Sequence, residues 1–180
     1  ILKSLHQNMS KDCIFNGYDI SPQAINIAKD KETSRLSFHK KKLLDFKLEQ
    51  KQDLLLIIDV IEHVEDIFNF LRGIRLHGKY KIFHIPLDLS VLSVARRKPL
   101  ILSRNQVGHI HYFNLDLALS ILNETGYEIC DYFFTNGSIE LPRKTFKSWM
   151  MKFPRFIMNS ISPRYNAHLF GGSSLMVLAK

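Results

Sequence analysis

The sequence predicts a doubly wound α/β domain with a mostly parallel sheet. The first observation is that apolar runs of strand length alternate with segments of helical periodicity along the chain. The second is the run over residues 53–60, which is almost continuously apolar, as is typical of a strand buried on both faces of a parallel sheet. The third is the composition: 46% of the 180 residues are hydrophobic and 23% are charged. These fractions are those of a globular domain, and they exclude fibrous and fully disordered proteins.

The N-terminal part of the chain contains the first four expected elements. The pattern predicts a helix over residues 2–9, a strand over 13–19 and a second strand over 36–40. Between these strands, Ser21 followed by proline is typical of a helix start, because serine caps the first turn and proline fits the first helical position. We therefore expect a helix over residues 22–30.

The remaining elements follow the apolar run. Asn114 and Gly126 are typical of a helix start and a helix end, respectively. Residues 88–108 have a less regular pattern and are expected to be irregular or partly helical. The other expected elements are a helix over 65–76, a strand over 80–85, a helix over 116–125, a strand over 127–135 and a last strand within 169–179.

The C-terminal quarter of the chain is basic. The net charge is +8, and all 17 acidic residues lie at or before Glu140, so the residues after it carry positive charges only. Aromatic and Met side chains accompany these charges, although Pro154 is expected to break or bend a helix there. We expect residues 136–167 to form a basic aromatic insertion or lid. A helix packed on the core, a peripheral membrane contact through residues 143–157 and a nucleic-acid patch are the alternatives.

The two cysteines and the lengths of the apolar runs indicate the redox state of the thiols and whether the sequence contains a membrane span. Cys13 and Cys130 make no disulfide framework and have no metal-ligand spacing, so we expect reduced, buried thiols in a cytoplasmic protein. The longest apolar run, over residues 54–58, is far shorter than the roughly 20 residues of a membrane span.

Ionisable side chains gather where buried strands are expected to end. Asp19 closes the strand over 13–19, and Asp45 follows the strand over 36–40. The segment DVIEHVED at 59–66 comes at the end of the apolar run. Charged groups there are costly unless they face a cleft, and open α/β sheets bind ligands at the carboxyl ends of their strands. We therefore expect a ligand site at this edge, although Asp19 and Asp45 taken singly are also explained as turn caps.

Four segments resemble class I S-adenosylmethionine-dependent methyltransferases in their order and spacing. They are GYDISPQAINIAK at 17–29, LLDF at 43–46, DVIEHVED at 59–66 and GHIHYFN at 108–114. The resemblance covers the chain to about residue 135 and also the last strand, where LFGGSSLMVLAK is typical of one branch. It implies a Rossmann-like methyltransferase sheet with an antiparallel last strand. The cofactor, S-adenosyl-L-methionine, would lie across the carboxyl ends of the strands.

The resemblance also implies the cofactor contacts residue by residue. Asp19 would hold the ribose hydroxyls, and Ile20 would pack on the adenine. The other implied contacts are Leu44, Asp45 and Phe46 around the adenine, with Asp45 accepting from its amine, and Asp59 and Val60 beside the methionine portion and the acceptor cavity.

One motif of the family is missing. The Gly-rich turn that cradles the methionine carboxylate is absent, and residues 2–9 resemble the helix that follows this turn. The first strand and its turn would then lie before Ile1. Without that central strand, the strands over 13–19 and 54–60 would leave backbone ladder groups unpaired. We therefore expect one methyltransferase-like domain over residues 1–180 that is N-terminally incomplete and lacks its first strand.

Three histidines are the candidate catalytic bases. His63 follows the apolar strand, and His109 and His111 lie in the segment GHIHYF. Methyl transfer from a sulfonium needs positioning and the removal of one proton, and imidazole has a pKa suited to that task. The alternative is structural: His63 would cap or pack a helix, and the other two would make loop hydrogen bonds.

A divalent metal is a second role for part of this set. Asp59, Glu62, His63 and His109 resemble an arrangement that binds a metal in some methyltransferases of RNA termini and of quinone precursors. A metal there would bind substrate hydroxyls and lower their pKa. The same EHV sequence is frequent in members of the family that use no metal. We therefore expect no metal, with these four residues as the alternative.

The acceptor is the least determined feature. The branch that methylates amines of nucleic acids usually carries an Asn/Asp-Pro-Pro-aromatic motif, where this chain has DVIEHV. We therefore expect methyl transfer to an oxygen or carbon of a small-molecule, glycan or lipid-precursor acceptor. The alternatives are an RNA-modifying methyltransferase that uses the basic C-terminal quarter, and a truncated or degenerate non-catalytic Rossmann-like domain.

Overall fold

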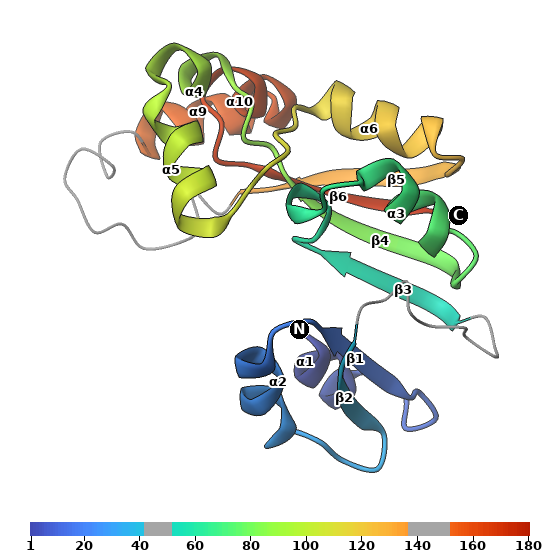
Figure 1. Cartoon of the computed structure of the whole chain (residues 1–180). Helices are drawn as coiled ribbons and strands as arrows, with labels where there is room; N and C mark the ends of the chain where they lie inside the picture. Colours follow the sequence, from blue (N-terminus) through green and yellow to red (C-terminus); the bar gives the residue numbers. More distant parts are fainter. Residues whose placement is uncertain (42–51, 137–151) are drawn as a thin grey trace. The chain divides into compact units, whose positions relative to one another are not determined.

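The computed structural model describes residues 1–41, 52–136 and 152–180 (Figure 1). By its internal contacts the chain divides into two compact units, Ile1–Glu49 and Gln50–Lys180. Each unit has a sheet of its own within the described residues. That residues 1–180 form one domain stays a prediction.

The unit Ile1–Glu49 holds a parallel pair of strands. Its elements are α1 (Leu2–Asn8), β1 (Phe15–Asp19), α2 (Pro22–Lys29) and β2 (Leu36–Lys40). All four lie where the sequence predicts them. Ser21 caps α2, because its Oγ accepts a hydrogen bond from the backbone N of Ala24 at 3.3 Å. A Cβ on Gly17 would lie 2.5 Å from the Phe38 ring, so β1 and β2 pack this closely only with glycine at that position.

The unit Gln50–Lys180 is built on a four-stranded sheet. Its strands are β3 (Gln52–Ile58), β4 (Gly78–Pro86), β5 (Ile129–Thr135) and β6 (Ser174–Ala179). Their order is β3-β4-β6-β5; β3 and β4 are parallel, and β6 runs antiparallel to both of its neighbours (Figure 1). This arrangement confirms the predicted α/β class, with parallel pairs early in the chain and an antiparallel last strand.

This unit also contains helices, some of which the sequence signals predict. Their bounds are η2 (Ile61–His63), α3 (Ile67–Ile74), α4 (Val91–Arg96), α5 (Lys98–Val107), α6 (Leu115–Glu124), α9 (Lys152–Ile161) and α10 (Pro163–Leu169). α3 and α6 bury their apolar faces, and the core that they share with the sheet includes Leu71, Leu122, Phe83 and Val177. Figure 1 shows α4, α5, α9 and α10 gathered beyond the carboxyl ends of β3 and β4.

The apolar run differs from its prediction in burial. Leu54 of β3 is 42% exposed, so this strand is not buried on both faces. The physical reason is that β3 is an outer strand of the described sheet, with a partner only on the β4 side. The strand also ends at Ile58, because Asp59 has a φ of 51° and leaves the extended conformation.

Three smaller predictions are corrected as well. Residues 88–108 contain two helices, α4 and α5, the first of them fixed by a capping box between Ser90 and Ser93. Pro154 does not break α9, because it lies in the first turn, where a backbone N–H has no intrahelical acceptor. Both cysteines are free, but neither is buried: Cys13 is half-buried, and Cys130 is exposed on β5, an outer strand. Among the described residues, no helix is long and apolar enough to cross a membrane.

Candidate active site

Three loops meet at the carboxyl ends of β3 and β4. η2 follows β3, Asp88 follows β4, and residues 108–111 follow α5. The backbone N–H groups of Ile110 and His111 both donate to the carbonyl oxygen of Glu62, at 2.8 and 3.1 Å. These two bonds hold the segment with His109 and His111 against η2, so residues 48 and 49 positions apart in sequence become neighbours.

His109 is oriented by a carboxylate. Its Nδ1 lies 2.6 Å from Oδ2 of Asp88, and the Ser103 hydroxyl lies 2.9 Å from the same nitrogen and donates to Asp88 Oδ2 at 3.2 Å. An ionised carboxylate only accepts hydrogen bonds, so the Nδ1 proton of His109 is donated to Asp88. In the neutral ring, Nε2 then carries the lone pair, which is the state of a general base or a metal ligand.

His63 has the same tautomer for a different reason. Its Nδ1 lies 3.0 Å from the carbonyl oxygen of Gly108 and donates to it, which leaves Nε2 with the lone pair in the neutral ring. Gly108 has a φ of 80° and ends α5 in the left-handed conformation, which a glycine adopts without strain. The His63 and His109 rings meet edge to face, with centroids 5.0 Å apart. Two basic nitrogens are therefore presented in one place.

Glu62 is an uncompensated buried acid. Its side chain is fully buried, and neither carboxyl oxygen has a hydrogen-bond partner among the described residues. Burial, assisted by the negative charge of Asp59, raises the pKa of Glu62 to about 7. The nearest basic atom, Nε2 of His63, lies 3.8 Å from Glu62 Oε1. A buried polar group without a partner calls for a functional explanation.

Part of this cluster has the geometry of a metal site. Glu62, His63 and His109 each offer a ligand atom, and the three atoms lie within 4.8 Å of one another. Carboxylate oxygen and imidazole nitrogen are ligands that divalent transition metals accept. The structure thus brings together three of the four residues of the metal alternative. Asp59 is outside this group.

Asp59 is engaged elsewhere. Its Oδ1 lies 2.6 Å from Nδ1 of His84 in the interior of β4, and Nε2 of His84 lies 3.1 Å from Oγ1 of Thr135 on β5. The hydrogen bond that His84 donates to the Asp59 carboxylate raises the pKa of His84. Val60, the N-cap of η2, is half-buried.

His111 makes a loop contact. Its Nε2 lies 2.8 Å from the carbonyl oxygen of Val64 and donates to it. This bond fits the structural alternative for His111, because it ties the segment after α5 to the residue after η2. Of the three candidate bases, the structure brings His63 and His109 ring to ring.

The sequence argument missed two groups that shape the site. Asp88 orients His109, and Ser103 bonds to both. Asp88 carried a usable signal, because it lies three residues after the end of the predicted strand over 80–85, where ligand groups are expected. Ser103 carried none, since it lies in a segment without a clear pattern.

Comparison with known proteins places this fold. A scan against protein-family models finds no match, and a search of curated proteins finds no significant one. Solved structures do match. A SAM-dependent methyltransferase from Archaeoglobus fulgidus is 18% identical with a TM-score of 0.60, and the match covers 99% of this chain and 92% of that one. The N-methyltransferase NodS from Bradyrhizobium japonicum, solved with S-adenosyl-L-homocysteine, is 14% identical with a TM-score of 0.55, and the shares are 98% and 81%.

This chain has the fold of the S-adenosylmethionine-dependent methyltransferases. The fold that the resemblance implied is thereby confirmed. The cyclase SpnF matches as well, at 12% identity and a TM-score of 0.62, over 98% of this chain and 68% of that one. Because SpnF is named for a different reaction, the methyltransferase fold alone does not assign the chemistry.

The residues that the methyltransferase resemblance assigns to the nucleoside lie in the unit Ile1–Glu49. Asp19 ends β1, and its Oδ1 accepts a hydrogen bond from the backbone N of Ser21 at 2.8 Å. This bond is the turn cap that the sequence kept as an alternative, and the carboxylate has a second oxygen. Ile20 is 67% exposed, so its apolar surface is available for contact. The other assigned residues, Leu44, Asp45 and Phe46, lie outside the described residues.

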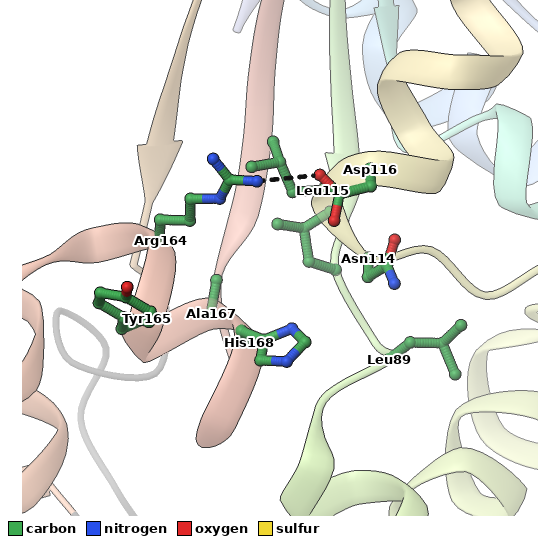
Figure 2. Close-up of a pocket in the computed structure, with 9 residues that line it drawn as sticks. Leu89, Asn114, Leu115, Asp116, Arg164, Tyr165, Ala167 and His168 are labelled. Carbon is green, nitrogen blue, oxygen red and sulfur yellow. Dashed lines mark hydrogen bonds and ion pairs between the residues drawn. The ribbon is translucent and has the colours of Figure 1, made fainter.

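A pocket lies in the unit Gln50–Lys180, and its lining includes residues on either side of Asp88. It has a volume of about 360 Å³ and lies between α10, the start of α6 and the loop after β4. Leu87 and Leu89, on either side of Asp88, belong to its apolar wall. Figure 2 shows the ion pair of Arg164 with Asp116, 3.1 Å long, at one end of the pocket and the His168 ring pointing toward Leu89. The pocket has the size and the mixed lining of a small-molecule site.

Proposed function

We propose that this protein transfers the methyl group of S-adenosylmethionine to an oxygen or carbon of a small-molecule, glycan or lipid-precursor acceptor. The observation that carries the proposal is the Asp88–His109 pair at the carboxyl ends of β3 and β4, which leaves Nε2 of His109 as a proton acceptor. The methyltransferase fold supports the cofactor, and the pair supports removal of a proton from the acceptor.

The described residues fit the cofactor in part. Asp19 offers a carboxylate at the end of a parallel strand, where α/β folds bind ribose hydroxyls, and Ile20 offers exposed apolar surface for the adenine. Asp59 and Val60, which follow β3, are the assigned contacts of the methionine portion. We retain Leu44, Asp45 and Phe46 as proposed adenine contacts.

The chemistry divides between cofactor and protein. S-adenosylmethionine, when bound, supplies an electrophilic methyl group on a sulfonium sulfur. The protein orients the acceptor and removes its proton as the oxygen or carbon attacks. In our proposal His109 Nε2 takes this proton, and Asp88 stabilises the imidazolium that results. His63 lies ring to ring with His109 and is the second candidate for the role, and His111 is the third.

The pocket between α6 and α10 is the proposed acceptor site. Its wall runs through Leu87 and Leu89, so it shares the loop that carries Asp88. The lining combines apolar side chains with the polar groups of Asn114, Tyr165 and His168, which suits an acceptor with an apolar body and a polar group. The pocket draws on α10, which belongs to the proposed lid over residues 136–167.

A second candidate adds a divalent metal to the same reaction. The buried, unpartnered carboxyl of Glu62 favours it, together with the two imidazole nitrogens beside it. A metal held there would bind acceptor hydroxyls and lower their pKa, so that no histidine is needed as base. Methyl transfer unaffected by EDTA and by added Mg²⁺, Mn²⁺ or Zn²⁺ would exclude this variant and leave the histidine proposal.

The partner follows from the acceptor class. We propose a small-molecule acceptor and a peripheral membrane contact in the C-terminal quarter, through residues 143–157, of which 152–157 are described. RNA modification is the other candidate, because the residues after Glu140 hold bases and no acid. RNA binding that weakens steeply with added salt, together with methyl transfer to RNA, would favour it.

The first test is calorimetric titration of the 180-residue chain with S-adenosylhomocysteine. We expect saturable binding, weakened by Asp19→Ala because the ribose loses its acceptor. The matched control is Asp12→Ala, which removes an exposed acid of the same unit outside the assigned contacts. The second step offers labelled S-adenosylmethionine and a panel of hydroxylated, carbonyl-activated and lipid-linked acceptors. Absence of cofactor binding would contradict the proposal and favour a non-catalytic domain.

A further inference from the structure

Four helices leave an unusual amount of apolar surface in contact with solvent. Half of the large apolar side chains that are exposed in the described residues lie on α4, α5, α9 and α10. These helices are neighbours: α4 contacts α5 and α10, and α10 contacts α9. Together they form the cap at the carboxyl ends of β3 and β4 (Figure 1).

α9 shows the pattern most clearly. Phe153, Phe156, Ile157 and Ile161 follow one another at helical spacing, and their exposed fractions are 70%, 59%, 43% and 72%. A helix on the surface of a globular protein normally turns such a stripe toward the core. Here the stripe faces solvent, which calls for a partner.

The remaining helices of the cap extend this surface. The exposed apolar side chains are Val91 and Val94 on α4, Ile101, Leu102 and Val107 on α5, and Tyr165 and Leu169 on α10. Most are aliphatic, and they come from separate helices. The surface is therefore broad, rather than a groove for one peptide segment.

The charged side chains on the four helices of the cap are all positive. None of the four helices contains Asp or Glu. Arg96, Arg97, Lys98 and Arg104 are exposed and make no ion pair among the described residues. Arg164 is different, since it pairs with Asp116, and Arg155 donates to the carbonyl oxygen of Phe170. The bases without an ion pair therefore lie at the end of α4 and along α5.

We propose that the cap of α4, α5, α9 and α10 docks on an anionic lipid bilayer. Exposed phenylalanines and aliphatic side chains insert at a membrane interface, and neighbouring bases attract anionic headgroups. A second copy of this chain fits less well, because a symmetric contact would press two acid-free basic surfaces together. RNA fits less well because Val, Ile and Leu do not stack on bases. The inference rests on the proposed function for its purpose, which is delivery of a lipid-linked acceptor to the pocket beside α10.

The test measures sedimentation of the full chain with vesicles. Phosphatidylcholine vesicles with and without phosphatidylglycerol are compared at low and high salt. We expect binding only with the anionic lipid, weakened by salt. The substitutions Arg96→Gln, Lys98→Gln and Arg104→Gln each lower the partition coefficient about fivefold. Phe153→Ser and Phe156→Ser each lower it about tenfold.

Matched controls distinguish vesicle binding through the cap from nonspecific binding of exposed apolar side chains. Phe133→Ser changes a side chain that is 57% exposed on β5, outside the cap, and leaves vesicle binding unchanged. Circular dichroism and the melting temperature verify that each variant is folded. Equal binding to both vesicle types, no binding, or unchanged binding by the cap variants overturns the inference. Stronger binding to a single-stranded RNA than to the anionic vesicles overturns it in favour of RNA.

The same samples are titrated with S-adenosylhomocysteine. Vesicle binding without cofactor binding keeps the docking surface and rejects the proposed methyl transfer. Cofactor binding without vesicle binding rejects the docking surface and leaves the proposed methyl transfer standing. The two failures are therefore distinguishable.

Discussion

Two histidine–aspartate pairs lie in the unit Gln50–Lys180, and they differ in the hydrogen bonding of the histidine Nε2 atom. Both pairs join Nδ1 to a carboxylate oxygen at 2.6 Å. In the pair with Asp59, His84 lies inside β4 and its Nε2 also contacts Thr135, so both nitrogens have partners. In the pair with Asp88, His109 follows α5, and its Nε2 has no hydrogen bond among the described residues.

This difference shows that the distance between Nδ1 and the carboxylate oxygen does not by itself identify a reactive histidine. A ring whose two nitrogens both have partners in the protein can hold strands together, but neither nitrogen is open to contact an acceptor molecule. A ring bonded on one side only, at the end of a strand, is oriented and still basic. The loop position of His109 creates this difference.

The largest expected effect is that of His109→Gln. Glutamine cannot take the acceptor proton, so turnover falls by about 10²-fold to 10⁴-fold. The measurement is the methyl-transfer rate with an acceptor from the panel, and calorimetry should give an unchanged affinity for S-adenosylhomocysteine. His84→Gln is the control, with nearly unchanged turnover. Comparable losses of turnover in His109→Gln and His84→Gln would contradict the proposal that His109, and not His84, takes the acceptor proton.

The next effect is a pH dependence of stability that depends on Glu62. Its pKa of about 7 in the folded protein lies above the ordinary value of 4.5, so the folded state binds the proton more tightly. The free energy of unfolding therefore falls as pH rises from 4.5 to 7, by about 3 kcal/mol at most, and levels off above. Urea unfolding of the metal-free protein at a series of pH values measures it.

Glu62→Gln should flatten this profile and stabilise the protein at pH 8, because the amide carries no charge to bury. Glu65→Gln, at an exposed carboxyl, is the matched control and should keep the wild-type profile. A profile that stays steep in Glu62→Gln would contradict the assignment. Stabilisation of the wild type by Mn²⁺ that is lost in this variant would favour the metal candidate instead.

Asp88→Asn should have a smaller effect on turnover than His109→Gln. The amide still accepts from His109 Nδ1 but no longer stabilises the imidazolium, and such partners typically contribute about 10-fold to 100-fold. Asp53→Asn, at an exposed carboxyl of β3 outside the assigned contacts, is the control and should keep the wild-type turnover. Equal turnover in Asp88→Asn and the wild type would contradict the positioning role of Asp88.

The smallest expected effect is that of His84→Gln on stability. The variant loses a charge-assisted bond to an exposed carboxylate, which contributes about 1 kcal/mol. Because the pKa of His84 is raised in the folded protein, this contribution is present below pH 6.5 and is lost as pH rises through the raised pKa. Thermal unfolding at pH 6 and pH 9 checks the sign. An equal melting-temperature difference at both pH values would contradict it.

The predicted elements agree with the structure where a local signal fixed them. Ser21-Pro22 begins α2, Asn114 caps α6, and the short apolar runs are strands. The signal failed where neighbours decide. The burial of β3 depends on which strand lies beside it. Helix α4 begins at a capping box of two serines within a segment of weak periodicity, and α5 begins without a side-chain cap.

The sequence by itself determined the α/β class, the resemblance to methyltransferases and the strand ends at which polar groups gather. These features depend on residue type, short-range spacing and hydrophobic period, all of which are local. It also named Glu62 and His63, which follow such an end, and His109, which lies in the segment GHIHYF of the methyltransferase resemblance.

Only the tertiary structure decided how these groups are used. Hydrogen bonds from Ile110 and His111 to the Glu62 carbonyl bring together loops that are distant in sequence. Folding also buries the Glu62 carboxyl without a hydrogen-bond partner among the described residues. It places Asp88 in hydrogen-bond contact with His109, and Asp59 in hydrogen-bond contact with His84. Tautomer, burial and pairing depend on which atoms meet across the sheet edge, and no local pattern contains that information.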